Sequence, residues 1–352
     1  MNDASRNTIH RRGFLGLLAG GGALAIAGAF APSRAFAQGT GTLHIGVLRA
    51  PASAIIDLTE KRGWFKDAGV TLKTELFASA AGPKIVQALG GGAIGLSFVN
   101  STAALLGMAG GAIPLRFTSI TTDPSRLFAL LAAPEFDSVP KLAGKKIACT
   151  AGSGLQYYLA RILTKFGMTQ KDIEFVNLPA AEGQSAFVAG RVDAIVPSVN
   201  GRFYIMNTRK DTRELFTYDD FTKPPGSTRP FQNFDLFVTT DAVLSSERKA
   251  LAAFLAAYHD KGVPFLLDPA TRPEALRIVT DYVNFEQKNP TDAAIMGRIM
   301  DQSGFYDRKT VKQLMTAPDF RENLEYQIKF FMDQGTLKSV PDLSKAIVTD
   351  LL

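Results

Sequence analysis

The sequence is poor in the residues that build disulfides, metal sites and nucleophilic active sites. It contains a single cysteine, Cys149, so a disulfide within the chain is impossible, and the apolar neighbours of Cys149 indicate a small core residue. Only two histidines, His44 and His259, follow residue 37, and neither belongs to a catalytic motif with a Cys, Asp or Ser. The chain also has no HExxH motif. We therefore expect no metal, no cofactor and no enzymatic activity.

A strong charge of either sign is lacking as well. The formal net charge is +6, and residues 1–37 contribute three of these charges, with four arginines against one aspartate. The charge that remains is too small for a typical nucleic-acid-binding domain, which presents a dense basic surface. We therefore expect no nucleic-acid partner.

Residues 1–37 have the features of an export signal. Arg11 and Arg12 precede an uncharged run rich in Gly and Ala, and an A-x-A triplet ends at Ala37. The segment around the two arginines resembles the twin-arginine translocation motif, with one departure at His10, where Ser or Thr is usual. We predict cleavage after Ala37. The alternative is a retained membrane anchor, because the apolar run is just long enough to span a bilayer.

The chain beyond residue 37 alternates between strand and helix patterns. It is long for one hydrophobic core, so two α/β lobes are the natural expectation. In the first part, the patterns predict strands at 43–48, 71–77, 94–99 and 113–120, and helices at 55–65, 83–89 and 103–108. Such alternation is typical of a parallel, doubly wound sheet.

A second strand and helix series begins after a pause at 132–140. It predicts strands at 147–149, 174–178, 192–196 and 234–239, and a helix at 182–189, and the chain from 245 onward reads as helical.

The leading candidate for a site is the segment 141–163. It reads as a strand, a turn at Gly152, Ser153 and Gly154, and a helix. Such a turn leaves the first amides of the helix free to hold a small polar or anionic ligand. Taken alone the turn is weak evidence, because α/β proteins contain several such units and this one matches neither a phosphate-binding loop nor a dinucleotide fingerprint.

Several expected strands in the first lobe end in a break or a polar residue. Arg49 follows the first strand, Ser79 the second, and Asn100 and Ser101 the third. Because the carboxyl ends of parallel strands meet at one edge of a sheet, we expect these side chains to converge there.

Six segments together resemble the periplasmic substrate-binding proteins of ABC transporters in the nitrate, taurine and alkanesulfonate group, which also includes binders of thiamine-type pyrimidines. The resemblance covers nearly all of the chain after the leader. The segments are LHIGVL (43–48), KRGWFKDAGV (61–70), ALGGGAIGLSFVNST (88–102), KLAGKKIACTAGSG (141–154), AFVAGRVDAI (186–195) and FVTTDAVLSSERKALAAFLAAY (237–258).

The resemblance implies a periplasmic binding protein fold of type II, with two doubly wound lobes joined by a hinge that the chain crosses twice. The crossings are expected near 131–134 and 229–234. The resemblance thus implies one lobe made of 42–132 together with 234–352, including the C-terminal helices, and another lobe made of 133–233. The resemblance also implies an inter-lobe cleft that binds a small ligand for delivery to an ABC permease in the inner membrane. The implied ligand-binding residues are Arg49, Ser79, Asn100, Ser101, Ser153, Gly154, Ser198, Asn200 and Asn233. Tyr157 is added to these candidates as a possible apolar wall for the ligand.

One departure from the family pattern affects the ligand. Where the family often has a run like Trp-Asp-Pro-Tyr, this chain has Ser-Val-Asn-Gly at 198–201, so the ligand need not be nitrate or a simple sulfonate. An inward-facing Arg49 would suit a carboxylate, sulfonate or phosphate, and a salt bridge is the alternative role for Arg49. Tyr157 and Phe187 suit either an apolar wall of the pocket or the core of their helices.

We therefore expect a periplasmic, monomeric solute-binding protein that captures a small organic anion, either sulfonate-like or a carboxylate. The alternative is a binding-fold sensor or scaffold that reports ligand to a separate partner. A third possibility is a pyrimidine-related periplasmic enzyme, since a thiamine-pathway enzyme uses a related fold, but its cysteine-rich motif is absent here.

Overall fold

The computed structural model describes residues 41–352 except 79, 110–112, 225–229 and 286–289. The predicted leader at 1–37 and the predicted site residue Ser79 therefore lie outside the described residues. Among the described helices, none combines the length and the apolarity that crossing a bilayer requires.

The first sheet has the strand order β2-β1-β3-β10-β4. β1 pairs in parallel with both β2 and β3, as the sequence predicts, whereas β10 runs antiparallel between β3 and β4. The prediction of a wholly parallel sheet is therefore wrong, and the sheet is mixed. Its strands are β1 (Gly41–Leu48), β2 (Val70–Phe77), β3 (Leu96–Asn100), β4 (Leu115–Thr122) and β10 (Asp235–Thr240).

The second sheet has the order β7-β6-β8-β5-β9. β6 is parallel to β7 and β8, while β5 is antiparallel to β8 and β9. β5 and β9 lie outside the strands that the sequence patterns predict. The strands are β5 (Ala129–Ala132), β6 (Lys146–Cys149), β7 (Glu174–Asn177), β8 (Ala194–Ile195) and β9 (Arg213–Thr217).

The chain passes between the sheets twice. It leaves β4 at Thr122 and enters β5 at Ala129, so the first crossing comes before the predicted segment 131–134, and β5 belongs with the second sheet. It leaves β9 at Thr217 and enters the first sheet again at Asp235. The second crossing was predicted at 229–234, and its described part, 230–234, lies in the segment between these two strands. The two-lobed α/β architecture is confirmed, and the exact limits of the lobes stay a prediction.

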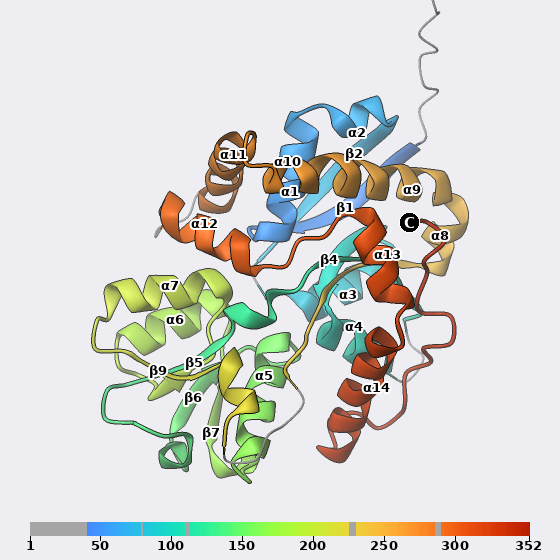
Figure 1. Ribbon diagram of the computed structural model, residues 1–352. Coiled ribbons are helices and arrows are strands. Elements are labelled where there is room, and N and C mark those ends of the chain that lie inside the picture. Colours follow the sequence, from blue (N-terminus) through green and yellow to red (C-terminus); the bar gives the residue numbers. More distant parts are fainter. Residues whose placement is uncertain (1–40, 79, 110–112, 225–229, 286–289) are drawn as a thin grey trace, which may run out of the picture. The chain divides into compact units, whose positions relative to one another are not determined.

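Helices follow most strands of both sheets (Figure 1). Those of the first sheet are α1 (Pro51–Lys61), α2 (Trp64–Asp67), α3 (Gly82–Gly90) and α4 (Ser101–Met108). Those of the second sheet are α5 (Gly154–Lys165), α6 (Ala180–Val188) and α7 (Val199–Thr208).

The C-terminal part is helical to Asp333, much as the sequence predicts. Apolar side chains along one side of these helices are buried, including Phe320, Leu324 and Ile328 of α14. After α14 the chain returns to the first sheet, where Ile347 forms a bridge with Phe117 of β4. The elements are α8 (Asp241–Ser246), α9 (Arg248–Ala257), a π-helical turn (Tyr258–Gly262), α10 (Val263–Leu267), α11 (Arg272–Asn284), α12 (Ala293–Gln302), α13 (Arg308–Thr316) and α14 (Pro318–Asp333).

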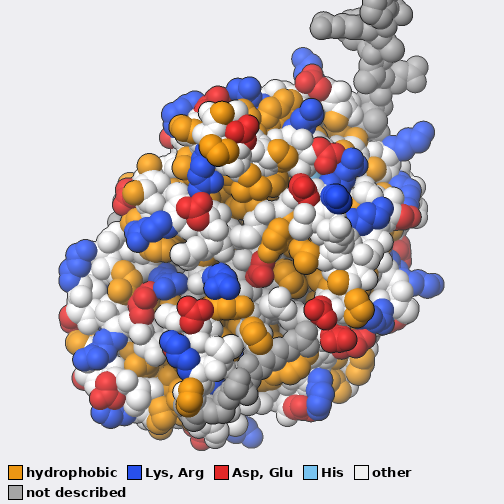
Figure 2. Space-filling model, in the orientation of Figure 1, with side chains coloured by type: hydrophobic (Ala, Val, Ile, Leu, Met, Phe, Trp, Pro, Cys, Tyr) orange, Lys and Arg blue, Asp and Glu red, His pale blue; other side chains and the backbone are white. Residues whose placement is uncertain are grey.

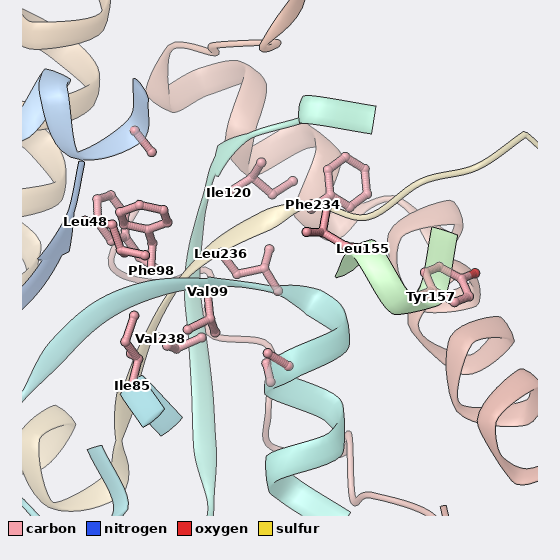
Figure 3. Close-up of a cluster of buried hydrophobic side chains, with 14 of the residues drawn as sticks. Leu48, Ile85, Phe98, Val99, Ile120, Leu155, Tyr157, Phe234, Leu236 and Val238 are labelled. Atoms are coloured by element: carbon pink, nitrogen blue, oxygen red, sulfur yellow. The ribbon is translucent and has the colours of Figure 1, made fainter. Parts of the chain in front are cut away.

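The largest hydrophobic core extends from the first sheet into helix α5. Figure 3 shows side chains of β3 and β10 gathered with Leu155 of α5 and with Phe234, which directly precedes β10. At the surface, basic and acidic side chains alternate over the face seen in Figure 2, and neither sign forms a continuous patch there.

Candidate functional site

A pocket of about 130 Å³ lies at the edge where strands of the first sheet end and helices of both lobes begin. Of the ten predicted site residues, six line it: Arg49, Asn100, Ser153, Gly154, Ser198 and Asn200. The residues that complete its wall are Leu48, Ala50, Pro51, Ala52, Ala80, Gly82, Ile85, Phe98, Val99, Thr122, Pro124, Leu127, Phe128, Leu155, Val199, Asp235 and Ser303.

The N-terminal ends of five helices line this pocket, four through their first residues and α4 through its cap residue, Asn100. They belong to α1, α3 and α4 of the first sheet and to α5 and α7 of the second. Each helix N-terminus carries roughly half a positive charge together with amides that have no acceptor inside the helix. Their convergence gives the pocket a positive field without requiring many basic side chains.

Asn100 stands at the junction of a strand and a helix. It ends β3 and caps α4, because its Oδ1 accepts a hydrogen bond of 2.9 Å from the amide of Ala103. The same side chain lies in the pocket wall. The capping hydrogen bond therefore fixes the orientation of the Asn100 side chain, and in this orientation the side chain lines the pocket.

Ser101 and Asn233 support the pocket from behind and are absent from its lining. Both are fully buried, and Ser101 Oγ donates a hydrogen bond of 2.7 Å to Asn233 Oδ1. Gln327 of α14 joins the cluster through a bond of 3.0 Å from its Nε2 to Ser101 Oγ. This placement suits a role in positioning the pocket wall, and the contact of Ser101 and Asn233 with a ligand stays a prediction.

Ser153 and Gly154 form the start of α5. The Ser153 hydroxyl donates to the carbonyl of Thr150 at 2.6 Å and accepts from the amide of Leu155 at 3.2 Å, so it is already engaged as the helix cap. At Gly154 a Cβ would lie 1.9 Å from Asn233 Nδ2 and 3.3 Å from Asn100 Cγ, so only glycine permits this close approach of α5 to the two asparagines. Ser153 and Gly154 thus contribute backbone, more than side-chain groups, to the pocket.

Tyr157 lies in the core and is absent from the pocket lining, so the structure gives its predicted ligand contact no support. Its side chain is fully buried, and its ring centre lies 5.2 Å from that of Phe231 and 5.4 Å from those of Phe330 and Phe331. Phe187 is likewise fully buried, in the second lobe. The core alternative fits both residues. The aromatic partners of Tyr157 are distant in the sequence, and Phe187 lies in a cluster with apolar residues such as Leu131 and Ile195.

Arg49 lies between aromatic rings at the edge of the pocket. Its guanidinium carbon is 4.6 Å from the ring centre of Tyr282 and 4.8 Å from that of Phe285. Within the described part of the chain, no carboxylate pairs with Arg49, so the expected alternative of a salt bridge is not found there. Stacking holds the side chain while leaving its positive charge available to an anion.

A second, larger hollow of about 1060 Å³ adjoins the pocket. Arg49, Ser198 and Asn200 line both spaces, so they mark where the two meet. Asn200 Oδ1 is buried and has no hydrogen-bond partner among the described residues. Ser198 caps α7, since its hydroxyl accepts from the amide of Gly201 at 3.3 Å. These three residues are therefore available to a ligand from either hollow.

Asp235 is a pocket residue that the sequence analysis missed. It is the first residue of β10, and its Oδ2 accepts a hydrogen bond of 3.0 Å from the hydroxyl of Thr122. Burial raises the pKa of Asp235 to about 7, and the nearby charge of Asp123 acts in the same direction. A single carboxylate inside the apolar run Phe-Asp-Leu-Phe-Val at 234–238 is the signal that points to it.

Ser119 and His259 form a buried pair whose residue types could serve as a nucleophile and a base. Ser119 Oγ lies 2.6 Å from His259 Nε2, and His259 Nδ1 lies 3.0 Å from the carbonyl oxygen of Tyr306. Both side chains are fully buried, and desolvation lowers the pKa of His259 to about 4. Neither residue lines the pocket. The hydrogen bond between them connects β4 to the π-helical turn. Across the described ranges, no three His, Cys, Asp or Glu side chains gather in a way that could hold a metal ion.

Comparison with known families gives one match that covers most of the chain. The NMT1/THI5-like family matches residues 50–271. A binding protein of Brucella abortus (strain 2308) is 27% identical over 173 residues, which are 49% of this chain and 52% of the relative. An aliphatic sulfonates-binding protein of Escherichia coli (strain K12) is 30% identical over 116 residues, or 32% of this chain and 36% of that protein. The chain thus spans about half or less of the length of the curated relatives it matches.

Solved structures match over a larger share of the chain. The alkanesulfonate-binding protein SsuA from Xanthomonas axonopodis pv. citri, bound to MOPS, superimposes with a TM-score of 0.69 at 18% identity, over 87% of this chain and 98% of that one. The periplasmic nitrate-binding protein NrtA from Synechocystis PCC 6803 gives a TM-score of 0.65 at 13% identity, over 88% and 86%. These matches confirm the periplasmic binding protein fold, and the proteins named are binding proteins.

Proposed function

Because the chain belongs to the NMT1/THI5-like family and has the periplasmic binding protein fold, we propose that it is a solute-binding protein for a small organic anion. The anion carries a sulfonate or a carboxylate group and binds in the pocket between the lobes. The protein is exported to the periplasm, with cleavage after Ala37, and works there as a monomer. It delivers its ligand to an ABC permease in the inner membrane.

The observation that carries this proposal is the positive field of the pocket. Five helix N-terminal ends and Arg49, which pairs with no carboxylate among the described residues, surround a space of about 130 Å³. The rest of the wall is largely apolar, with Leu48, Phe98 and Phe128 among its members. A small anion with a short apolar body suits such a site, since the helix ends and Arg49 neutralise its charge and the apolar wall receives its body.

The site favours ligand binding over catalysis. The buried Ser119 and His259 have no access to the pocket, so they cannot act on a ligand held there. A sensor or scaffold with the same fold remains the alternative function, because such a protein would use the same pocket. The two are distinguished by adding the ligand-loaded protein to its cognate permease in liposomes: an importer's binding protein stimulates ATP hydrolysis and uptake, whereas a sensor does not.

The first test is a thermal-shift screen of residues 38–352 against sulfonates, taurine, nitrate, small carboxylates, aromatic acids and pyrimidines. A ligand at 100 times its dissociation constant stabilises the folded protein by about 2.7 kcal/mol. For a chain of this length we expect a shift of a few degrees, confined to anions. A shift produced only by uncharged pyrimidines would overturn the anion proposal while keeping the binding function.

Arg49 gives a sharper test of the same proposal. Replacing Arg49 by Ala removes a charge-assisted contact, so we expect affinity for the anion to fall about tenfold to 100-fold. Arg62 provides a matched control, because its guanidinium also stacks on two rings, Trp64 and Phe265, yet it lines neither hollow. Arg62→Ala should leave the affinity unchanged. Equal affinities of the Arg49→Ala variant and the wild type, measured by calorimetry, would refute the assignment of Arg49.

A further inference from the structure

The pocket has a carboxyl group as well as a positive field. Asp235 lies in its wall and is hydrogen-bonded through Oδ2 to Thr122. No described residue forms an ion pair with Asp235 or a hydrogen bond to its Oδ1. A carboxyl group without a counter-charge is costly to bury, so its presence in a ligand pocket needs an explanation.

The strand order separates this carboxyl group from Arg49. Arg49 follows β1, Asp235 begins β10, and β3 lies between these two strands. Neighbouring strands are about 4.8 Å apart, so the backbones of β1 and β10 are roughly 10 Å apart. Asp235 pairs in register with Asn100 at the end of β3, which places it at the same edge of the sheet. The pocket therefore presents a cation at one end and a carboxyl group at the other.

The backbone at Asp235 is also irregular. The register of β10 against β4 shifts between Asp235 and Leu236. Such bulges re-aim a side chain and are common beside binding sites. Asp235 pairs with Thr122 on the other side of the shift, so the irregularity and the hydrogen bond together fix the direction of the carboxyl group.

We propose that Asp235 is a specificity-determining residue, which accepts a hydrogen bond from an ammonium or other N–H group at the end of the ligand opposite its anionic group. This inference rests on the proposed function, since it concerns the second end of the same anionic ligand. The ligand class is thereby narrowed to small bipolar molecules whose two ends are joined by a short apolar chain.

The charges around Asp235 make this recognition depend on pH. Among the described residues, the titratable groups that interact electrostatically with Asp235 are Asp123, from the segment after β4, and Tyr258, from the π-helical turn. Neither supplies a positive charge. With a pKa near 7, Asp235 is largely protonated at pH 6 and largely ionised at pH 8. An ammonium group therefore binds better at pH 8, and a ligand that has only an anionic group binds better at pH 6.

The test compares 3-aminopropane-1-sulfonate with propane-1-sulfonate, which lacks the amine. Calorimetry at pH 6 and pH 8 should give a preference for the amino compound of at least about tenfold at pH 8, and a smaller one at pH 6. Asp235→Asn keeps the shape of the side chain but removes its charge. In this variant we expect the preference and its pH dependence to disappear, while propane-1-sulfonate still binds.

Asp241→Asn is the matched control, because Asp241 directly follows the other end of β10, pairs with Arg116 and lies outside the pocket. It should keep the wild-type preference. If both sulfonates bind the wild type equally at both pH values and Asp235→Asn changes neither affinity, the assignment of Asp235 is wrong and the anion site stands. If neither sulfonate binds the wild type and other anions also fail, the proposed function fails, and the inference with it.

Discussion

Adding a single methyl group at Gly154 tests the contact between α5 and the first lobe. A Cβ at this position would lie 1.9 Å from Asn233 Nδ2 and 3.3 Å from Asn100 Cγ. Asn233 cannot move without weakening the hydrogen bond of 2.7 Å that its Oδ1 accepts from Ser101, and another of 3.3 Å from the amide of Thr102. A lost hydrogen bond costs about 1 kcal/mol, and overpacking costs about 1–3 kcal/mol. We expect Gly154→Ala to lower the free energy of unfolding by about 2–4 kcal/mol.

Gly183 of α6 provides the control for this substitution. A Cβ there would meet its nearest neighbour, Ile195 Cδ1, at an ordinary 3.5 Å, so Gly183→Ala should be neutral, or stabilise the helix by up to about 1 kcal/mol. Chemical denaturation followed by circular dichroism measures both variants. If Gly154→Ala proves as stable as Gly183→Ala, the close approach of α5 to Asn233 does not exist in solution.

Two further predictions concern buried groups. Burial lowers the pKa of His259 to about 4, so this side chain stays neutral in the folded protein. Below pH 6.5 the unfolded chain therefore binds more protons than the folded protein. The free energy of unfolding should fall by up to about 3 kcal/mol as the pH drops from about 6.5 to 4. Urea denaturation at stepped pH values should show this loss, and a His259→Gln variant that keeps the same pH profile would contradict it. Burial raises the pKa of Cys149, so its thiol should resist a disulfide reagent in the folded protein and react once the protein is unfolded. Rapid labelling under native conditions would show that β6 is not buried as described.

Much of the site could be predicted because its signals are local. Asn100 and Ser153 cap the helices that follow their strands, and a cap residue between an apolar strand and a helix is visible in the sequence. The prediction that strand ends converge then places Arg49 beside them, and all three line one pocket.

What could not be predicted depends on partners that are distant in the sequence. Tyr157 has a helical spacing that suits either a pocket or a core, and its aromatic neighbours Phe231 and Phe330 decide for the core. The direction of β10 depends on how the chain returns from the second lobe, which no local pattern encodes. Asp235 was missed because a strand is predicted from its apolar residues. In the strand that begins at Asp235, the informative residue is the one that is not apolar.

The position of β10 affects the order in which the protein can fold. β10 lies between β3 and β4, although the chain reaches it only after the five strands of the second sheet have been made. When β3 and β4 emerge from the ribosome, the strand that pairs with both of them has not yet been synthesised. The strands of the second sheet are consecutive in the chain, from 129 to 217, so that sheet can form before β10 is made. Until residue 240 has been made, two apolar strand edges in the first lobe stay unpaired, which is the interval in which the nascent chain is most exposed to aggregation.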